Sequence, residues 1–323
     1  MNSRKIKMIS FMLFLSIFWG TSFAQKNNRQ NDSDSLISLA QKYEAEENFS
    51  NAIELYQKAI NEEDTSTYVI LKLAQLYFKQ SEYFESLFWI EKRLKTDSSD
   101  VNALYFKILN LNNLEQYEKL IETCNKFLKI TESKNDLVYY IRGVANIELK
   151  NYKEAYSDLY QCLEINPDYS DAYMPFGAAG VELSLFDEGR YFLNKSIDHK
   201  VKVSQSYYYL GRSYFKENNY KEALKFYNLT VNQYNHKSNE CDEFCISVLM
   251  DMASLYIAIG EFSDAYIALE RFKGTNKNFT PQEFEDYIRL YMFLEKYNEA
   301  SEIIKEAVKV YPEHGRFYGL NLY

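Results

Sequence analysis

The chain has 323 residues, of which 46% are hydrophobic and 26% are charged, a composition typical of a folded protein and unlike that of a disordered one. With only 10 Gly and 4 Pro it has too few turn residues for an all-β sandwich or barrel, so a mostly helical chain is expected. The formal net charge of −9 disfavours binding to nucleic acid or to anionic lipid surfaces, because their phosphate groups repel an acidic protein.

Residues 1–24 have the three parts of a secretory signal. A basic start is followed by an apolar stretch over residues 8–19 and then by small residues at Ser22 and Ala24. The apolar stretch is shorter than the ~20 residues that cross a bilayer, which disfavours the alternative of an uncleaved membrane anchor. We therefore expect cleavage after Ala24, a polar lead-in over residues 25–32, and an exported protein that is periplasmic or secreted, in a bacterial cell envelope.

A repeated unit with a period of 34 residues fills most of the remaining chain. The eight predicted repeats span residues 33–66, 67–100, 101–134, 136–169, 170–203, 204–237, 246–279 and 281–314. Position 17 is aromatic in all eight, position 8 is small in six, and position 20 is small in seven. Small residues at positions 8 and 20 let two antiparallel helices approach closely, while large residues at positions 4, 7, 11, 17 and 24 fill the space around the crossing. The sequence therefore predicts an all-α chain of helix-turn-helix units that bury their apolar faces on one another.

These columns resemble the pattern of the tetratricopeptide repeat family. The segments 207–214 (YYYLGRSY) and 219–224 (NYKEAL) carry the resemblance, which extends over all eight repeats. The third repeat departs from the pattern at Lys107, Ile108 and Leu120. The resemblance implies a right-handed superhelical solenoid whose concave face is lined by the first helix of each pair. It also implies a role in holding proteins or peptides rather than in chemistry.

The resemblance places positions 2, 5, 9, 12 and 13 of each repeat on the concave face. In the middle of the array these positions form an apolar and aromatic strip, suited to a protein or peptide segment with apolar or aromatic side chains. The predicted groove residues are Leu71, Tyr105, Leu109, Tyr140, Val144, Met174, Tyr208 and Arg212. The alternative is that these side chains only pack against the next repeat. A clamp for a peptide's terminal carboxylate, found in some family members, is largely missing, because its positions hold Ile37, Gln41, Lys72, Asn102 and Phe106.

No residue pattern supports catalysis, a metal or a cofactor. The three histidines, His199, His236 and His314, are dispersed and have no neighbour at metal-ligand spacing. The sequence also lacks a phosphate-binding glycine loop and a nucleophile elbow. We therefore expect a protein that is not an enzyme and that needs no cofactor.

The four cysteines fall into two groups. Cys124 and Cys162 occupy packing positions of their repeats and are expected to be buried. Cys241 and Cys245 lie in an insertion between the sixth and seventh repeats, where an oxidising compartment would favour a local disulfide. Two free thiols in this insertion are the alternative.

Two regions depart from the regular repeat. In the fifth repeat, Pro175 with Gly177 and Gly180 predicts a late helix start or a bend that divides the array into repeats one to four and five to eight. The alternative is close packing on glycine with a locally shifted helix start. At the C-terminus, the apolar tail over residues 315–323 either folds over the last repeat or leaves an end face for a partner or a second copy of the chain.

Taken together, these features predict an exported scaffold for protein–protein interactions that binds a segment in the concave groove. The alternatives are a structural homo-oligomer that associates through the C-terminal end, and an accessory subunit of an envelope assembly or transport complex.

Overall fold

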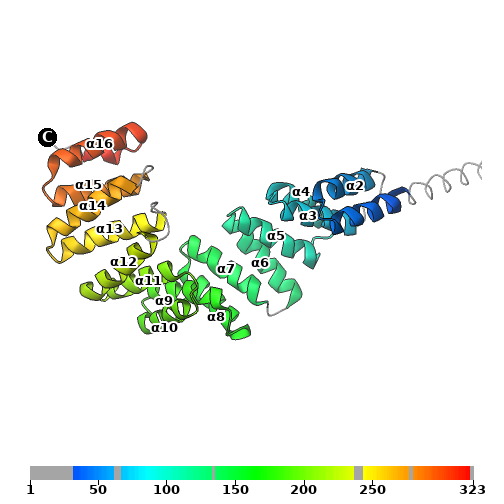
Figure 1. Cartoon of the computed structure of the whole chain (residues 1–323), viewed down its shortest axis with the longest axis horizontal. Helices are drawn as coiled ribbons and strands as arrows, with labels where there is room; N and C mark the ends of the chain where they lie inside the picture. The colour runs from blue at the N-terminus through cyan, green and yellow to red at the C-terminus, as the bar shows by residue number, and fades with distance from the viewer. Residues whose placement is uncertain (1–31, 62–66, 133–134, 236–242, 276–278, 321–323) are drawn as a thin grey trace, which may run out of the picture. The chain divides into compact units, whose positions relative to one another are not determined.

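The computed structural model describes residues 32–61, 67–132, 135–235, 243–275 and 279–320. Within these ranges the chain consists of helices and turns and has no strand (Figure 1), which confirms the all-α fold class. The predicted signal peptide lies outside the described residues, as does the lead-in except for its last residue. No helix in the described ranges is both long and apolar enough to span a membrane.

The chain divides into two compact units, Met1–Leu149 and Lys150–Tyr323, called unit 1 and unit 2. Unit 1 contains a helix over residues 32–45, α2 (Phe49–Asn61), α3 (Thr67–Lys79), α4 (Tyr83–Thr96), α5 (Val101–Asn113), α6 (Tyr117–Thr131) and α7 (Asp136–Glu148). Unit 2 contains α8 (Tyr152–Ile165), the 3₁₀ turn η1 (Ser170–Ala172), α9 (Tyr173–Glu182), α10 (Phe186–Asp198), α11 (Val203–Lys216), α12 (Tyr220–Asn235), α13 (Glu243–Ala258), α14 (Phe262–Thr275), α15 (Pro281–Phe293), α16 (Tyr297–Val310) and α17 (Arg316–Gly319). Within each unit, helices that are neighbours in the chain pack in sequence, as α3 does with α4 and α11 with α12.

The small residues at positions 8 and 20 lie where the two helices of a pair cross. In the second repeat, the Ser86 hydroxyl donates a hydrogen bond of 2.7 Å to the backbone carbonyl of Ala74. In the fifth repeat, a Cβ atom on Gly177 would lie only 2.8 Å from the backbone oxygen of Gly189. Because a real Cβ does not approach a backbone oxygen so closely, this crossing requires glycine.

The aromatic residue at position 17 begins the second helix of each pair, as Tyr83 begins α4 and Tyr220 begins α12. Two residues earlier, the backbone takes a left-handed conformation with φ between 53° and 83°, at Glu47, Ser81, Glu115, Lys150, Ser184, Asn218, Gly260 and Glu295. The next N–H then bonds back to the carbonyl five residues earlier, as Glu82 does to Tyr77 at 2.9 Å. This is the hydrogen bond of a Schellman motif, which ends the first helix.

In the fifth repeat, the structure shows close packing on glycine together with a locally shifted helix start. The α-helix begins late, at Tyr173, after the 3₁₀ turn η1. Pro175 is therefore in the first turn of α9, where its missing N–H would have had no intrahelical partner. Gly177 and Gly180 both pack against Gly189 of α10. The boundary between the two units lies at residues 149 and 150, inside the fourth predicted repeat rather than at the fifth.

The described part of the C-terminal tail folds over the last repeat. Phe317 of α17 is fully buried, and its ring centroid lies 6.1 Å from that of Phe284 on α15. Beside it, the carboxylate of Glu285 accepts a hydrogen bond from the His314 ring at 2.9 Å and pairs with Arg289 at 3.2 Å. The tail to residue 320 thus covers apolar surface of α15, while self-association through this end of the chain stays a prediction.

Candidate peptide-binding face

The first helices of successive pairs contact one another within each unit. In unit 1, α3 contacts α5 and α5 contacts α7; in unit 2, α9 contacts α11, α11 contacts α13, and α13 contacts α15. We call the surface that these helices present the first-helix face of each unit. The predicted groove residues are divided between the two faces. Unit 1 carries Leu71, Tyr105, Leu109, Tyr140 and Val144, and unit 2 carries Met174, Tyr208 and Arg212.

In unit 1 all five predicted groove residues are half-buried. Tyr105, Leu109 and Tyr140 pack against the apolar core that α5, α6 and α7 share. The Tyr105 ring centroid lies 6.1 Å from that of Phe127 on α6 and 6.2 Å from that of Phe106. Leu71 packs against a smaller core cluster that includes Ile90. These contacts agree with the alternative that part of the strip serves internal packing.

At the start of unit 1, polar contacts tie neighbouring first helices together. Lys72 of α3 forms an ion pair of 2.8 Å with Glu44 in the helix over residues 32–45. Gln41 in that helix donates a hydrogen bond of 2.9 Å to the Tyr68 hydroxyl. Because Lys72 already neutralises a carboxylate, it is poorly placed to hold the terminal carboxylate of a bound peptide, which agrees with the incomplete clamp in the sequence.

In unit 2, Arg212 is the centre of a network that joins three first helices. Its Nε donates to Glu182 Oε1 on α9 at 3.0 Å, and its Nη2 lies 2.9 Å from the same oxygen. Its Nη1 donates to the Tyr208 hydroxyl at 3.1 Å and lies 3.7 Å from Asp251 Oδ2 on α13. The second oxygen of Glu182 pairs with Lys216 at 2.7 Å. Arg212 and Lys216 nevertheless remain 30% and 27% exposed, so both cations still face solvent.

Burial controls the ionisation of this network. It raises the pKa of Asp251, although the Arg212 guanidinium opposes the rise. Burial and the Asp251 carboxylate also raise the pKa of Tyr208 and of Tyr227. For Arg212, burial would lower the pKa, but Tyr208 and the two carboxylates outweigh it and raise the value. Asp251 Oδ2 and the Tyr227 hydroxyl are both buried without a hydrogen-bond partner among the described residues.

Of the residues that sequence analysis selected in unit 2, only Arg212 presents a largely polar surface. Tyr208 is 8% exposed and lies 5.9 Å, centroid to centroid, from Tyr227. Met174 is half-buried and packs on the cluster that contains Val181. The aromatic side chain of Tyr208 is thus mostly part of the core, and its hydroxyl is held by Arg212.

Sequence analysis did not select Glu182, Lys216 or Asp251. Glu182 and Lys216 both occupy position 13 of their repeats, one of the positions expected on the concave face. Their opposite charges were therefore a usable signal. Asp251 occupies position 6, which gave no such signal.

The cysteines and histidines form no site in the described part of the chain. Cys124 and Cys162 are buried, as expected for packing positions. Cys241 lies outside the described residues, and the side chain of Cys245 is not described, so their disulfide stays a prediction. His236 also lies outside the described residues. Within the described ranges, no group of His, Cys, Asp and Glu residues is arranged to hold a metal ion.

Comparison with known proteins identifies the repeat. Two family models, each described as tetratricopeptide repeat, match residues 137–169 and 289–314 in one case and 205–234 in the other. The heat shock protein STI1 of Saccharomyces cerevisiae is 31% identical over 84 residues, which are 26% of this chain and 14% of that protein. A TPR repeat-containing protein of Methanocaldococcus jannaschii is 27% identical over 126 residues, which are 36% of this chain and 22% of that protein. These matches therefore span less than a quarter of either curated relative.

The likeness extends to a solved structure. A tetratricopeptide repeat protein from Parabacteroides merdae aligns over 82% of this chain and 99% of its own length, with a TM-score of 0.54. Its sequence identity is 17%, so this likeness shows the fold alone. Proteins built from such repeats serve as scaffolds for protein–protein interaction and are typically not enzymes. The family models, the relatives and the helix-pair architecture together make this chain a member of the tetratricopeptide repeat family.

Proposed function

We propose that the chain binds a segment of a partner protein on the first-helix face of unit 2, along α9, α11 and α13. The observation that carries the proposal is the Glu182–Arg212–Asp251 network. It fixes the directions of half-exposed charged groups before any partner arrives. Because these side chains of the face are already ordered, binding a segment would immobilise few of them. Binding would therefore cost less side-chain entropy than it would at a surface of free lysines and arginines.

The chemistry of this face favours a segment whose backbone is recognised together with an apolar side chain. The guanidinium of Arg212, which is 30% exposed, offers N–H donors to carbonyl groups of a bound segment. Met174 supplies an adaptable apolar contact nearby. The opposite charges in the network nearly cancel, so the face has no strong preference for an acidic or a basic segment.

Site-specific photo-crosslinking tests this proposal. A benzoylphenylalanine in place of Ser254, which is exposed on α13, reports on the first-helix face. The same group in place of Asn228, which is exposed on α12, reports on the opposite helix of a pair. We expect a discrete adduct from native extract at Ser254 and none at Asn228. Equal labelling at the two positions would contradict the proposal.

The matched variants are Arg212→Gln and Arg190→Gln. Arg212→Gln leaves Glu182 paired with Lys216 but removes the cation beside Asp251, so the fold of this variant is verified before its crosslinking is compared. Arg190 on α10 makes comparable ion pairs, with Asp187 at 2.9 Å and with Glu217, but lies on a second helix. The Ser254 adduct should fall at least severalfold with Arg212→Gln and persist with Arg190→Gln, while circular dichroism verifies that both variants are folded.

We propose in addition that the protein acts outside the cytoplasm, on the basis of the signal pattern in residues 1–24. Sequencing the N-terminus of protein recovered from envelope and culture fractions tests this. A mature chain that begins at Gln25 is the expected result. Recovery of the uncleaved chain in the cytoplasmic fraction alone would overturn the proposal.

A further inference from the structure

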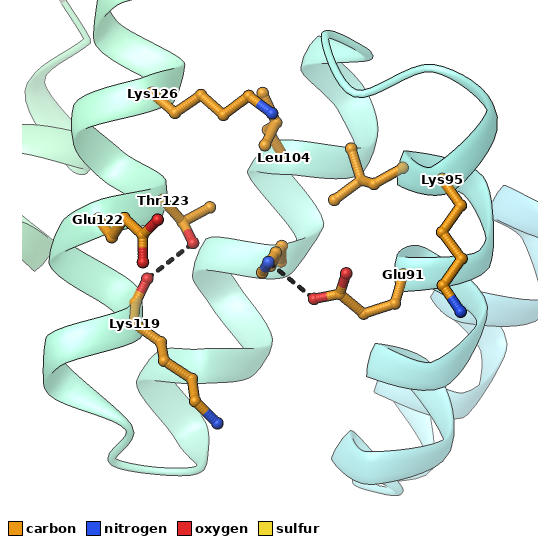
Figure 2. A pocket seen from close by; sticks show the side chains of 9 residues that line it. Glu91, Lys95, Leu104, Lys119, Glu122, Thr123 and Lys126 are labelled. Carbon is orange, nitrogen blue, oxygen red and sulfur yellow. Dashed lines mark hydrogen bonds and ion pairs between the residues drawn. The ribbon is translucent and has the colours of Figure 1, made fainter.

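A pocket of about 420 Å³ opens between α4, α5 and α6 in unit 1 (Figure 2). Leu94 and Leu104 supply apolar surface, and four lysines, Lys95, Lys107, Lys119 and Lys126, contribute to the lining. Its volume is in the range of pockets that take small ligands or single large side chains. The pocket lies within one unit and shares no residue with the first-helix face of unit 2.

The pocket has a local cause in the sequence. Lys107 occupies position 7 of the third repeat, where the second repeat has the fully buried Leu73. A large apolar side chain at this position fills the space beside the helix crossing. Lys107 instead directs its ammonium group to Glu91 on α4, at 2.7 Å, and the space between α4 and α6 stays open (Figure 2).

The pocket carries an excess of positive charge. Lys107 is neutralised by Glu91, and Lys119 donates a hydrogen bond of 3.0 Å to the amide oxygen of Gln116. Among the described residues, no carboxylate lies within ion-pair distance of Lys95, Lys119 or Lys126. Figure 2 shows Lys95 extending from one wall and Lys119 and Lys126 from the other. With Glu122 as the remaining acid, the residues that line the pocket carry an excess of two positive charges, in a chain of net charge −9. Asp97, which lies outside the lining, also interacts electrostatically with Lys126.

An exposed aromatic stripe leads to this pocket. Phe84 and Phe88 on α4 are 66% and 62% exposed, and they precede Glu91 and Lys95 at the helical spacing that puts all four on one face. Singly exposed apolar residues are ordinary, but two aromatic rings in line with a basic pocket form an amphipathic surface. This surface therefore combines two exposed aromatic rings with lysines that form no ion pair among the described residues.

We propose that this surface of α4 and α6 binds an acidic segment of a partner protein. Carboxylate side chains of the segment face Lys95, Lys119 and Lys126, and an apolar side chain next to them packs on Phe84 and Phe88. Charge complementarity selects the segment, because the rest of this acidic chain repels it. The proposal is independent of the first-helix face, and either site can exist without the other.

Fluorescence anisotropy with labelled peptides tests the proposal on the full chain. The probe is the peptide Glu-Phe-Glu-Glu-Leu-Glu. Two control peptides have Gln in place of every Glu, or Ala in place of Phe and Leu. We expect binding of the first probe that weakens as salt is raised, since salt screens exposed charges. Both altered probes should bind about tenfold more weakly. No binding of the first probe, or equal binding of the Gln version, would overturn the proposal.

Two pairs of variants locate the binding. Lys95→Gln/Lys119→Gln/Lys126→Gln should weaken binding of the probe about tenfold. Lys153→Gln/Lys221→Gln/Lys305→Gln, which removes the same charge at exposed positions on α8, α12 and α16, should not. Phe88→Ala should weaken it severalfold, and Tyr191→Ala, at the same repeat position on α10 and 57% exposed, should leave it unchanged. Equal effects within either pair would refute the site. Full displacement by millimolar phosphate with no effect of Phe88→Ala would instead indicate a small-anion pocket, which also refutes it.

Discussion

The crossing of α9 and α10 gives the sharpest test of how this chain is packed. Replacing glycine by alanine inside a helix ordinarily stabilises it by about 1 kcal/mol. For Gly177→Ala we expect the opposite sign. The new Cβ would lie 2.8 Å from the backbone oxygen of Gly189 and 2.8 Å from Cγ of Leu193. Leu193 is fully buried and the other contact is backbone, so neither group can move aside cheaply.

The size of the effect follows from these contacts. Overpacking a tight core costs about 1–3 kcal/mol, and the gain in helix propensity offsets only part of this. We expect Gly177→Ala to lose about 1–2 kcal/mol of stability in urea unfolding followed by far-ultraviolet circular dichroism. Hydrogen exchange should show the loss of protection concentrated in residues 173–198. Gly274→Ala is the control, because a Cβ there would have nothing within 4 Å.

For the reasoning to stand, Gly177→Ala must lower the free energy of unfolding and Gly274→Ala must not. Gly274→Ala should be neutral or stabilising by up to about 1 kcal/mol. If Gly177→Ala were as stable as the parent chain, with full protection of α9 and α10, the two helices would not approach as closely as their glycines imply. The interpretation of positions 8 and 20 as close-approach positions would then be wrong.

Two further predictions concern the turns and the C-terminal end. Glu115→Gly should stabilise the chain by about 0.5–1 kcal/mol, because Glu115 has a φ of 53°, which glycine adopts more easily. Gly260→Ala should destabilise the chain by about 1 kcal/mol or more, because Gly260 has a φ of 83°. If the melting temperatures of both variants moved in the same direction, the left-handed turn would be contradicted. The hydrogen bond from His314, with Arg316 and Arg289 nearby, lowers the pKa of Glu285 below its ordinary value of 4.5. A lowered carboxyl pKa stabilises the fold above the ordinary value, and that stabilisation is lost as the pH falls through the folded-state pKa. Glu285→Gln should therefore be less stable than the parent chain at neutral pH and equal to it at strongly acidic pH. If the difference in denaturation midpoint between the two proteins stayed constant with pH, ionisation of Glu285 would not be the source of the stabilisation.

The parts of the fold that depend on local periodicity were predictable from the sequence. The aromatic column marks where each second helix begins, because each of these residues stands at a fixed distance after the turn. The left-handed turns could not be predicted in this way. Only Gly260 among them is glycine, and residues such as Glu115 and Lys150 carry no preference for positive φ. Their conformation is imposed by the packing of the helices on either side.

The candidate surfaces were predictable only in part, because they depend on distant pairings. Arg212 was selected from its repeat position, but its partner Glu182 lies 30 residues away, and the pairing depends on how α9 and α11 align. Tyr208 was expected to line the groove and is mostly buried, since its ring packs toward Tyr227. A repeat position specifies a face of one helix, whereas burial depends on the neighbours of that face.

Lys107 both breaks the repeat pattern of the third repeat and leaves the pocket between α4, α5 and α6 open. Restoring the regular pattern by Lys107→Leu should fill the space beside the helix crossing and stabilise the chain by about 1 kcal/mol. The same change should remove the open space between α4 and α6 and leave Glu91, which is 45% exposed, without its partner. The freed carboxylate would then repel an acidic peptide, so binding of the acidic probe should fall as stability rises. A variant that gained stability and kept full binding would show that the pocket is not needed for recognition, and a loss of stability would show that the lysine is already well accommodated.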